Sequence, residues 1–320
     1  MTESVTRMAD HDRLAHARAL AERVLHRVGE IVLGKDREIQ LAITCLLARG
    51  HLLIEDLPGV GKTLLARSLA TALGLDFRRL QFTSDLLPAD VIGVSIFEPA
   101  SGSFRFHPGP LFAQLVLADE VNRATPKAQS ALLEAMEEHQ VTADGETYPL
   151  PDPFFVIATQ NPAHQVGTFP LPESQLDRFL MRIGIGYPAP ELERKLLRGD
   201  DRRAMLEQMD PVVSASEITE MQAAARSIHV ADAALDYAQA LVAWTRESPA
   251  FEAGLSPRAA VDLLRAARCW AMLHGHRGVR PEDLKAVFVP VAAHRLRGRD
   301  HSGQPAESLA HQVLDNVPVP

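Results

Sequence analysis

The sequence is poor in cysteine, has no long apolar run and carries no excess of positive charge. Its 320 residues include two cysteines, Cys45 and Cys269, which lie far apart in apolar, helix-like contexts. This excludes a disulfide framework and predicts buried free thiols in a reducing compartment. No apolar run approaches the roughly 20 residues that a membrane span needs. Charged residues crowd positions 1–30, where a signal peptide would need an apolar core. We therefore expect a cytoplasmic protein without membrane insertion.

The net charge and the length further limit the kind of protein and the number of domains. The net charge of −8 argues against a broad nucleic-acid footprint, so we expect no nucleic-acid partner, although a local basic channel stays compatible with it. The composition, 46% hydrophobic and 23% charged, is that of a soluble globular protein. A chain of 320 residues is long enough for two domains with a large core.

The first part of the chain alternates between helical and strand-like patterns. Helical spacing of apolar residues covers positions 12–28 and 36–49. Apolar runs then predict strands at 51–55, 77–83, 114–119 and 154–160, with a weaker one at 180–186. Helical patterns separate several of these strands, which predicts a parallel sheet with crossover helices.

Two predicted hairpins interrupt the alternation of strands and helices, and after it the pattern becomes all helical. Segments 84–110 and 139–153 read as inserted β-hairpins, the second one around Asp144-Gly145. Exposed Phe104 and Phe106 in the first hairpin would indicate a partner surface or a pore loop. After position 190 the patterns are helical, at 191–207, 214–227, 231–247, 257–273 and 281–295. We predict an α/β domain over 1–187 and an all-α lid domain over 188–320.

The most informative segment is 51–63, where an apolar run leads into a glycine loop that ends in Gly61-Lys62-Thr63. A helical pattern begins at Leu64, so strand, glycine loop, Lys-Thr and helix follow one another in the order of a phosphate-binding P-loop. Lys62 should reach the β- and γ-phosphates of a nucleoside triphosphate, and Thr63 should hold Mg²⁺. The predicted cradle consists of Pro58, Gly59, Val60, Gly61, Lys62, Thr63 and Leu64.

One position departs from the usual P-loop pattern. Asp56 stands where a first glycine is expected, five residues before Gly61. A carboxylate close to phosphates is unfavourable unless its side chain points away from them. The sequence alone leaves open whether Asp56 affects nucleotide affinity.

Acidic and amide residues follow two of the predicted strands. The apolar run 115–118 ends in Asp119 and Glu120, and a buried strand that ends in two acids indicates a function at its tip. We expect Asp119 to hold magnesium and Glu120 to activate the attacking water. The alternative, a helix N-cap, is already supplied by Thr125. Asn161 follows the strand 154–160 and could hold water or the γ-phosphate, or could simply start a turn with Pro162.

Together these blocks resemble the MoxR family of AAA+ ATPases. The matching text is Glu55–Thr63, Asp119–Ala124, Gln129–Glu138, Ala158–Pro162, Leu171–Phe179 and Ser256–Ala259. The resemblance runs from about residue 30 to the C-terminus, and the number of ordered blocks makes it specific. It implies that the two hairpins are the family's inserted hairpins, and that Asp at position 56 is a familiar variant.

The resemblance also implies roles for three residues. Asn161 resembles the sensor-1 residue, and Arg178 resembles an arginine finger that acts on the nucleotide of a neighbouring subunit. Arg258 resembles sensor 2, and the helix start Ser256-Pro257 would aim it at the γ-phosphate. Read without the family, Arg178 could instead pair with Asp177 or Glu173, and Arg258 could be an ordinary surface arginine.

The function that this resemblance implies is ATP hydrolysis with Mg²⁺ in a homo-oligomeric ring, expected to be a hexamer, with active sites shared between subunits. It further implies chaperone-like remodelling of a partner, often a von Willebrand factor A domain protein. Two other functions stay open at this stage. One is a nucleotide-regulated binding scaffold with little turnover, and the other is a DNA motor of the same branch, which the acidic charge disfavours.

Overall fold

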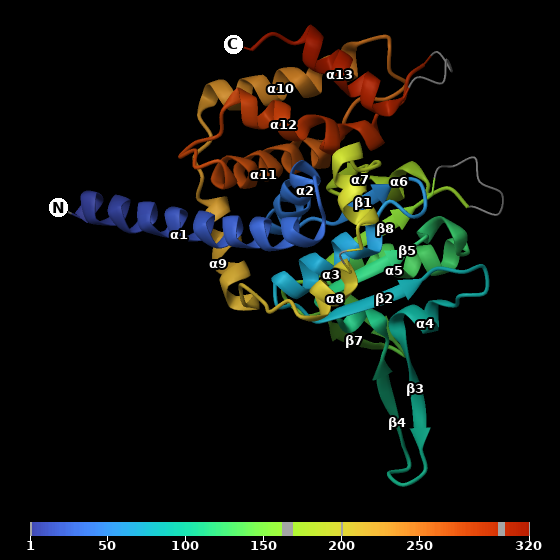
Figure 1. Cartoon of the computed structure of the whole chain (residues 1–320). Helices are drawn as coiled ribbons and strands as arrows, with labels where there is room; N and C mark the ends of the chain where they lie inside the picture. Colours follow the sequence, from blue (N-terminus) through green and yellow to red (C-terminus); the bar gives the residue numbers. More distant parts are fainter. Residues whose placement is uncertain (1, 162–168, 200, 300–304, 320) are drawn as a thin grey trace.

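A computed structural model describes residues 2–161, 169–199, 201–299 and 305–319. Its centre is a five-stranded sheet with the order β2-β5-β8-β1-β9, in which every neighbouring pair is parallel (Figure 1). The strands are β1 (Leu52–Glu55), β2 (Phe77–Gln81), β5 (Leu115–Asp119), β8 (Phe155–Gln160) and β9 (Met181–Ile183). All five strands predicted from apolar runs are therefore confirmed, and their carboxyl ends lie at one edge.

The three central strands β1, β5 and β8 are buried almost throughout. Parallel strands covered on both faces have this continuous apolar character. Alternate residues point to opposite faces, so Leu52 and Ile54 join one hydrophobic cluster and Leu53 joins another. The first cluster continues into α1 (Thr2–Ile31), α2 (Asp36–Leu47) and α3 (Lys62–Ala72). The second cluster lies beneath α5 (Pro126–Glu138) and α4 (Pro88–Ile92).

Both predicted hairpins are present. The first pairs β3 (Gly93–Glu98) with β4 (Ser103–Pro108) and projects away from the rest of the molecule (Figure 1). The second pairs β6 (Gln140–Ala143) with β7 (Glu146–Pro149), and Asp144 and Gly145 between them both have positive φ, as a tight hairpin turn requires. Phe104 is exposed, whereas the ring of Phe106 stacks on Tyr148 at 4.1 Å, so only the first of the two predicted aromatics is an open surface.

The second part of the chain is helical, as predicted, with one correction and one addition. Its elements are α7 (Pro190–Leu197), α8 (Arg202–Glu207), α9 (Ala215–Arg226), α10 (Asp232–Glu247), α11 (Pro257–Leu273), α12 (Pro281–Ala292), η3 (Ala293–Arg295) and α13 (Ala306–Asn316). The single helix predicted over 191–207 is two helices, because Gly199 adopts φ +96° and ends the first. Helix α13 was not expected from the sequence pattern.

Short helical segments connect the larger elements around the sheet. They are η1 (Pro110–Phe112), η2 (Val121–Arg123) and α6 (Glu173–Leu176). Among the described residues, no helix combines the length and the apolar character that crossing a membrane requires.

The first two helices bridge the α/β part and the helical part of the chain. Helices α1 and α2 pack against α9 and α11, and one hydrophobic cluster includes residues of both parts. The strands end at β9, close to the predicted boundary. The division into 1–187 and 188–320 stays a prediction, since the apolar core continues across it.

Candidate functional site

The P-loop lies between the carboxyl end of β1 and the amino end of α3. Gly59 and Gly61 adopt φ +86° and +102°, a region that residues with a Cβ avoid. No atom lies within 4 Å of the position that a Cβ on either glycine would occupy, so the loop borders open space. The first backbone N–H groups of α3 have no partner within the helix and offer donors to an anion.

The Asp56 side chain points away from this loop. Its Oδ2 accepts hydrogen bonds from the backbone N–H groups of Ile185 (2.7 Å) and Gly186 (2.6 Å), and its Oδ1 accepts one from Leu57 (2.7 Å). The carboxylate therefore ties the P-loop to the segment after β9. This geometry explains how an acid can replace the usual glycine.

Lys62 is held at the start of α3 with its ammonium group among oxygen atoms. The side chain is 8% exposed, and Nζ donates to the backbone carbonyl of Asp56 and, at 3.3 Å, to that of Gln160. A longer contact of 3.4 Å joins Nζ to Asn161 Oδ1. Burial lowers the pKa of Lys62, and the nearby carboxylates, Asp56 first, oppose that shift. The lysine is thus positioned beside the loop before any phosphate binds.

Asp119 lies at the carboxyl end of β5 with both carboxylate oxygens engaged. Oδ1 accepts a hydrogen bond from Thr159 Oγ1 at 2.6 Å, and Oδ2 accepts two from the Arg79 guanidinium at 2.6 and 3.0 Å. The side chain of Arg79 is half-exposed, whereas Thr159 is buried. Asp119 is therefore fixed from the interior by Thr159 and reached from the open side by Arg79.

Glu120 stands in a strained backbone conformation next to Asp119. Its φ of +56° lies in the left-handed region, which a residue with a long side chain adopts at a cost. The carboxylate accepts from Asn161 Nδ2 (3.2 Å) and Gln81 Nε2 (3.1 Å), and it pairs with Arg123 (3.1 Å). Asn161 thus joins Glu120 to Lys62, and strain at a residue held this firmly points to a role for its carboxylate.

These groups line one cavity of about 860 Å³, a size typical of small-molecule sites. Pro58, Gly59, Gly61, Lys62, Thr63, Leu64, Asp119, Glu120 and Asn161 border it on the sheet side, and Val60 packs against the core instead. Helix α8 closes the opposite wall through Arg202, Arg203 and Leu206. The structure therefore brings together the predicted cradle, the two acids and the predicted sensor-1 residue.

Three residues that bind the two acids, Arg79, Gln81 and Thr159, were not predicted from the sequence. Arg79 and Gln81 lie two positions apart on β2, and each binds one of the two acids. Thr159 binds both Asp119 and the backbone N–H of Glu120, the latter at 2.9 Å. A usable signal was present: polar residues at alternate positions of β2, and a hydroxyl inside an otherwise apolar strand, are costly unless they have partners.

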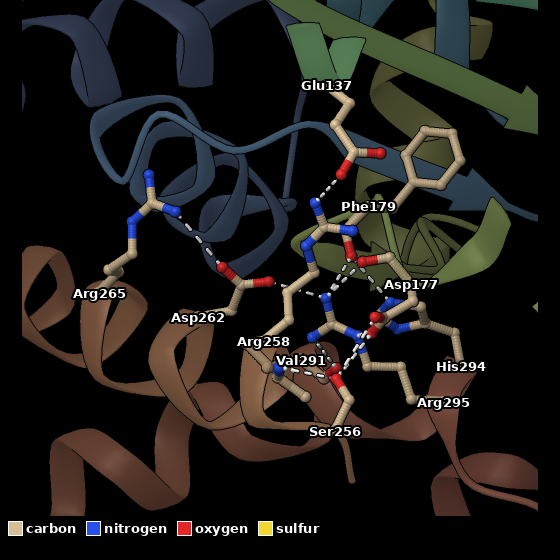
Figure 2. A network of polar contacts seen from close by, with 11 residues as sticks. Glu137, Asp177, Phe179, Ser256, Arg258, Asp262, Arg265, Val291, His294 and Arg295 are labelled. Carbon is tan, nitrogen blue, oxygen red and sulfur yellow. Dashed lines mark hydrogen bonds and ion pairs between the residues drawn. The ribbon is translucent and has the colours of Figure 1, made fainter. Parts of the chain in front are cut away.

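Arg178 and Arg258 lie elsewhere, in a second hollow of about 160 Å³. Arg178 Nε is 2.9 Å from Glu137 Oε2, and an Arg258 terminal nitrogen is 2.5 Å from Glu137 Oε1, so one carboxylate at the end of α5 binds both (Figure 2 shows the Arg258 contact). Hydrogen bonding to Arg258 is the main cause that lowers the Glu137 pKa. We call this group, Glu137 with Arg178 and Arg258, the arginine cluster.

The arginine cluster corrects two expectations. Arg258 does not border the P-loop cavity of its own chain, so the expected aim at that γ-phosphate is not what the structure shows. Arg178 pairs with neither Asp177 nor Glu173, because Arg295 binds the first and Arg297 binds the second. The hollow includes Gly50 and His51 at the amino end of β1, whereas the P-loop follows its carboxyl end.

The P-loop cavity fits a nucleotide and its magnesium ion on its own chemistry. A glycine loop with no atom in the Cβ positions leaves room for phosphates, and Lys62 supplies the matching charge. Asp119 and Thr63 supply the carboxylate and hydroxyl oxygens that Mg²⁺ prefers. A nucleoside triphosphate with Mg²⁺ requires oxygen ligands for the ion and hydrogen-bond donors for the phosphates in one cavity.

The proteins that this chain resembles include ATPases, in agreement with a cavity that fits a nucleotide. Residues 51–181 match the family described as "ATPase family associated with various cellular activities (AAA)", and residues 243–315 match the AAA lid domain. The chain is 40% identical to Chaperone MoxR1 of Mycobacterium tuberculosis over 86% of this chain and 75% of that protein. It is 32% identical to Protein MoxR of Methylorubrum extorquens over 95% of this chain and 96% of that protein.

Two further similarities cover nearly the whole chain. An uncharacterised Bacillus subtilis protein, YeaC, is 41% identical over 94% of this chain and 95% of its own length. The crystal structure of a proposed ATPase from Cytophaga hutchinsonii superposes with a TM-score of 0.89 at 35% identity, covering 98% of this chain and 99% of that one. The sheet order, the helical lid and these relatives agree, and the chain belongs to the MoxR family of AAA+ ATPases.

Proposed function

We propose that this protein hydrolyses ATP to ADP and phosphate at the P-loop cavity. The observation that carries the proposal is the convergence of the glycine loop, Lys62, Asp119 and Glu120 on one cavity. Lys62 and the first amides of α3 would bind the phosphates, with Pro58, Gly59, Val60, Gly61 and Leu64 completing the cradle. Thr63 and Asp119 would hold Mg²⁺, which supplies positive charge against the phosphate oxygens.

Glu120 is the proposed base that orients and deprotonates the attacking water. Its carboxylate borders the cavity, accepts from the amide groups of Asn161 and Gln81, and pairs with Arg123. Asn161 also contacts Lys62, so it would act as the sensor that links the base to the phosphate-binding lysine. Arg79 donates to Asp119 Oδ2 and would orient the carboxylate that would hold Mg²⁺.

We further propose that the active site is shared between subunits of a homo-oligomer, with a hexamer as the expected size. Arg178 and Arg258 both belong to the arginine cluster and border a different hollow from the P-loop cavity of their own chain. Positive charge supplied from a neighbouring subunit is a known way to stabilise the phosphoryl-transfer transition state. In this proposal Arg178 is the finger, and Arg258 acts beside it on the same neighbouring nucleotide.

The work done by this hydrolysis is proposed to be remodelling of another protein. The relative named Chaperone MoxR1 supports a chaperone-like role. The family resemblance suggests a client with a von Willebrand factor A domain. Helices α9 to α13 would form most of the lid whose movement transmits the nucleotide state.

Phosphate release from ATP with Mg²⁺ tests the catalytic proposal. The wild-type chain should release phosphate, Lys62→Ala should bind ATP weakly, and Glu120→Gln should bind ATP and scarcely hydrolyse it. A nucleotide-regulated scaffold is the alternative, and it predicts tight ATP binding by the wild type with no phosphate release above the Lys62→Ala background.

A further inference from the structure

Arg295 is a buried arginine of the lid that contacts the segment carrying Arg178. It belongs to η3, and its side chain is 4% exposed. Nε lies 2.8 Å from Asp177 Oδ1, and one terminal nitrogen donates to Asp262 Oδ2 at 2.9 Å (Figure 2). The same nitrogen donates to the backbone carbonyls of Asp177 and Phe179, each at 3.0 Å.

A buried guanidinium is costly unless its donors and its charge are compensated. The other terminal nitrogen of Arg295 donates to Val291 O at 3.0 Å, so each side of the planar group has an acceptor. Burial raises the pKa of Asp262, and the guanidinium groups of Arg295 and Arg265 act against that shift. Arg295 is the cation that Asp177 and Asp262 share, and without it both carboxylates would lose this partner.

The contacts of Arg295 enclose Arg178 in the sequence. Asp177 and Phe179 are the residues on either side of Arg178, and Arg295 binds the carbonyl of each. His294, the residue before Arg295, also contacts Phe179 O at 2.9 Å. The backbone that carries Arg178 is thus fixed by the lid rather than by the sheet alone.

The same contacts reach Arg258 on α11. Ser256 caps this helix by accepting from the N–H of Ala259 at 3.1 Å, and its hydroxyl contacts the Asp177 carboxylate at 3.3 Å. Asp262, four residues after Arg258 and so on the same helix face, binds Arg295. Arg258 therefore stands between two residues of the network, and Figure 2 shows these side chains converging on Arg295.

We propose that Arg295 is a positioning residue that holds Arg178 and Arg258 as one unit directed at the nucleotide of a neighbouring subunit. The inference rests on the proposed shared site and goes beyond it. It gives a positioning role to Arg295, which borders neither the P-loop cavity of its own chain nor the hollow of the arginine cluster. Both arginines already meet at Glu137. Arg295 binds the backbone carbonyls on either side of Arg178 and the Asp262 side chain one turn after Arg258. A shift of the lid would then move the two arginines together.

The test compares Arg295→Gln with Arg297→Gln, a control two residues away whose side chain is 62% exposed and pairs with exposed Glu173. Misplacing a catalytic group by about 1 Å can cost about 100-fold in rate. We expect kcat for ATP hydrolysis to fall by about that factor in Arg295→Gln, with ATP affinity at its own P-loop unchanged. Arg297→Gln should keep the wild-type kcat, and a wild-type kcat in folded Arg295→Gln would overturn the proposal.

Mixed assemblies separate a positioning role from damage to the fold. Each variant is assembled in equal amounts with Lys62→Ala, whose own P-loop is disabled while its arginines are intact. Because Lys62→Ala subunits can supply arginines to their neighbours, the mixture with Arg295→Gln should hydrolyse ATP well above the mean of the separate variants. Absence of this recovery, while Arg178→Ala does recover in the same mixture, would overturn the role of Arg295 and leave the shared site intact. If Arg178→Ala does not recover either, the shared site itself is wrong, and the inference falls with it.

Asp177→Asn provides a second route if Arg295→Gln does not fold. Its side chain is 26% exposed and keeps its shape, so the change weakens the link to Arg295 without leaving the buried guanidinium unpaired, because Asp262 still binds it. A loss of kcat that Lys62→Ala subunits restore would support the proposal. A wild-type kcat in Asp177→Asn and in the conservative variant Arg295→Lys would contradict it, since Lys cannot bind acceptors on both sides as the planar guanidinium does.

Discussion

The P-loop cavity and the arginine cluster are both rich in charge, but they are built in opposite ways. In the cavity, a glycine loop and the start of α3 border open space, and the acids Asp119 and Glu120 face it. In the arginine cluster, two cations share the single carboxylate of Glu137, and the hollow beside them is about one-fifth of the volume. One region has room for a substrate, and the other holds two partly exposed arginines on one carboxylate.

In the proposed shared site, neither region is a complete hydrolytic site within one chain. The cavity holds the predicted base and magnesium ligands, but Arg178 and Arg258 are not part of it. The two regions follow opposite ends of β1, so a small rearrangement of side chains cannot merge them. In that proposal, the P-loop cavity of one subunit and the arginine cluster of its neighbour would together form one hydrolytic site.

The largest expected effect separates the two regions by function. Arg178→Ala should lower kcat of the assembled protein by about 1000-fold, the scale seen for arginine fingers. ATP affinity should stay close to that of the wild type, because the P-loop cavity is unchanged. Phosphate release and equilibrium binding of a fluorescent ATP analogue measure the two quantities. A matched loss of ATP affinity would place Arg178 in its own chain's cavity and break the comparison.

Glu120→Gln should lower kcat by about 100-fold or more, since a positioned general base contributes about that much. The amide keeps a similar shape and can still contact Asn161, so ATP should remain bound. Glu138→Gln, an exposed change at the end of α5, is the control and should keep wild-type turnover. Single-turnover hydrolysis resolves the chemical step, and an unchanged rate in Glu120→Gln would assign the base elsewhere.

Acid is expected to lower the stability of the fold through His51, which is buried beside the arginine cluster. Burial is the main cause that lowers the pKa of His51 to about 4. Its Nδ1 accepts from Val156 N–H at 3.0 Å, which requires the neutral ring. The unfolded chain binds a proton near pH 6.5 and the folded chain does not, so stability is full above that pH and falls as the pH drops toward 4.

From pH 7.5 to pH 5 the free energy of unfolding should decrease by about 2 kcal/mol through His51. Urea denaturation of the wild type and of His51→Asn at both pH values measures the contribution. The variant is expected to be less stable at neutral pH but to lose about 2 kcal/mol less on acidification. Equal pH dependence in the two proteins would show that His51 is not the titrating group.

The smallest expected effect concerns Asp56. Asp56→Ala removes the acceptor for the N–H groups of Ile185 and Gly186, so unfolding should become easier by about 1–2 kcal/mol. ATP affinity should change by less than about threefold, because the carboxylate points away from the cradle. Asp56→Asn, which keeps one acceptor oxygen, should lie between wild type and Asp56→Ala in stability. A tenfold change in ATP affinity would instead make Asp56 part of the phosphate site.

Much of the P-loop side could be predicted from the sequence, because its signals are local. Apolar runs locate the strands, Gly61-Lys62-Thr63 defines the cradle, and acids at the end of β5 define the catalytic edge. Parallel strands then bring those ends together without further information. The start of α11 at Ser256-Pro257 was equally readable, since capping depends on neighbouring residues.

The arginine cluster could not be predicted in the same way, because long-range packing decides it. Arg258 reaches Glu137 across 121 positions of the sequence, and its helix alone gives no direction. Arg295 had the pattern of a helix end, and its burial depends on how η3 meets the loop before β9. The resemblance singled out Arg178 and Arg258, and their shared contact with one carboxylate follows only from the tertiary structure.

The most direct test of the shared site mixes two inactive proteins. Arg178→Ala has an intact cavity and Lys62→Ala has an intact arginine cluster, so each lacks what the other supplies. Assembled together in equal amounts, they should recover ATP hydrolysis well above the sum of the two separate activities. Activity that stays at that sum, in assemblies shown to contain both chains, would contradict the account.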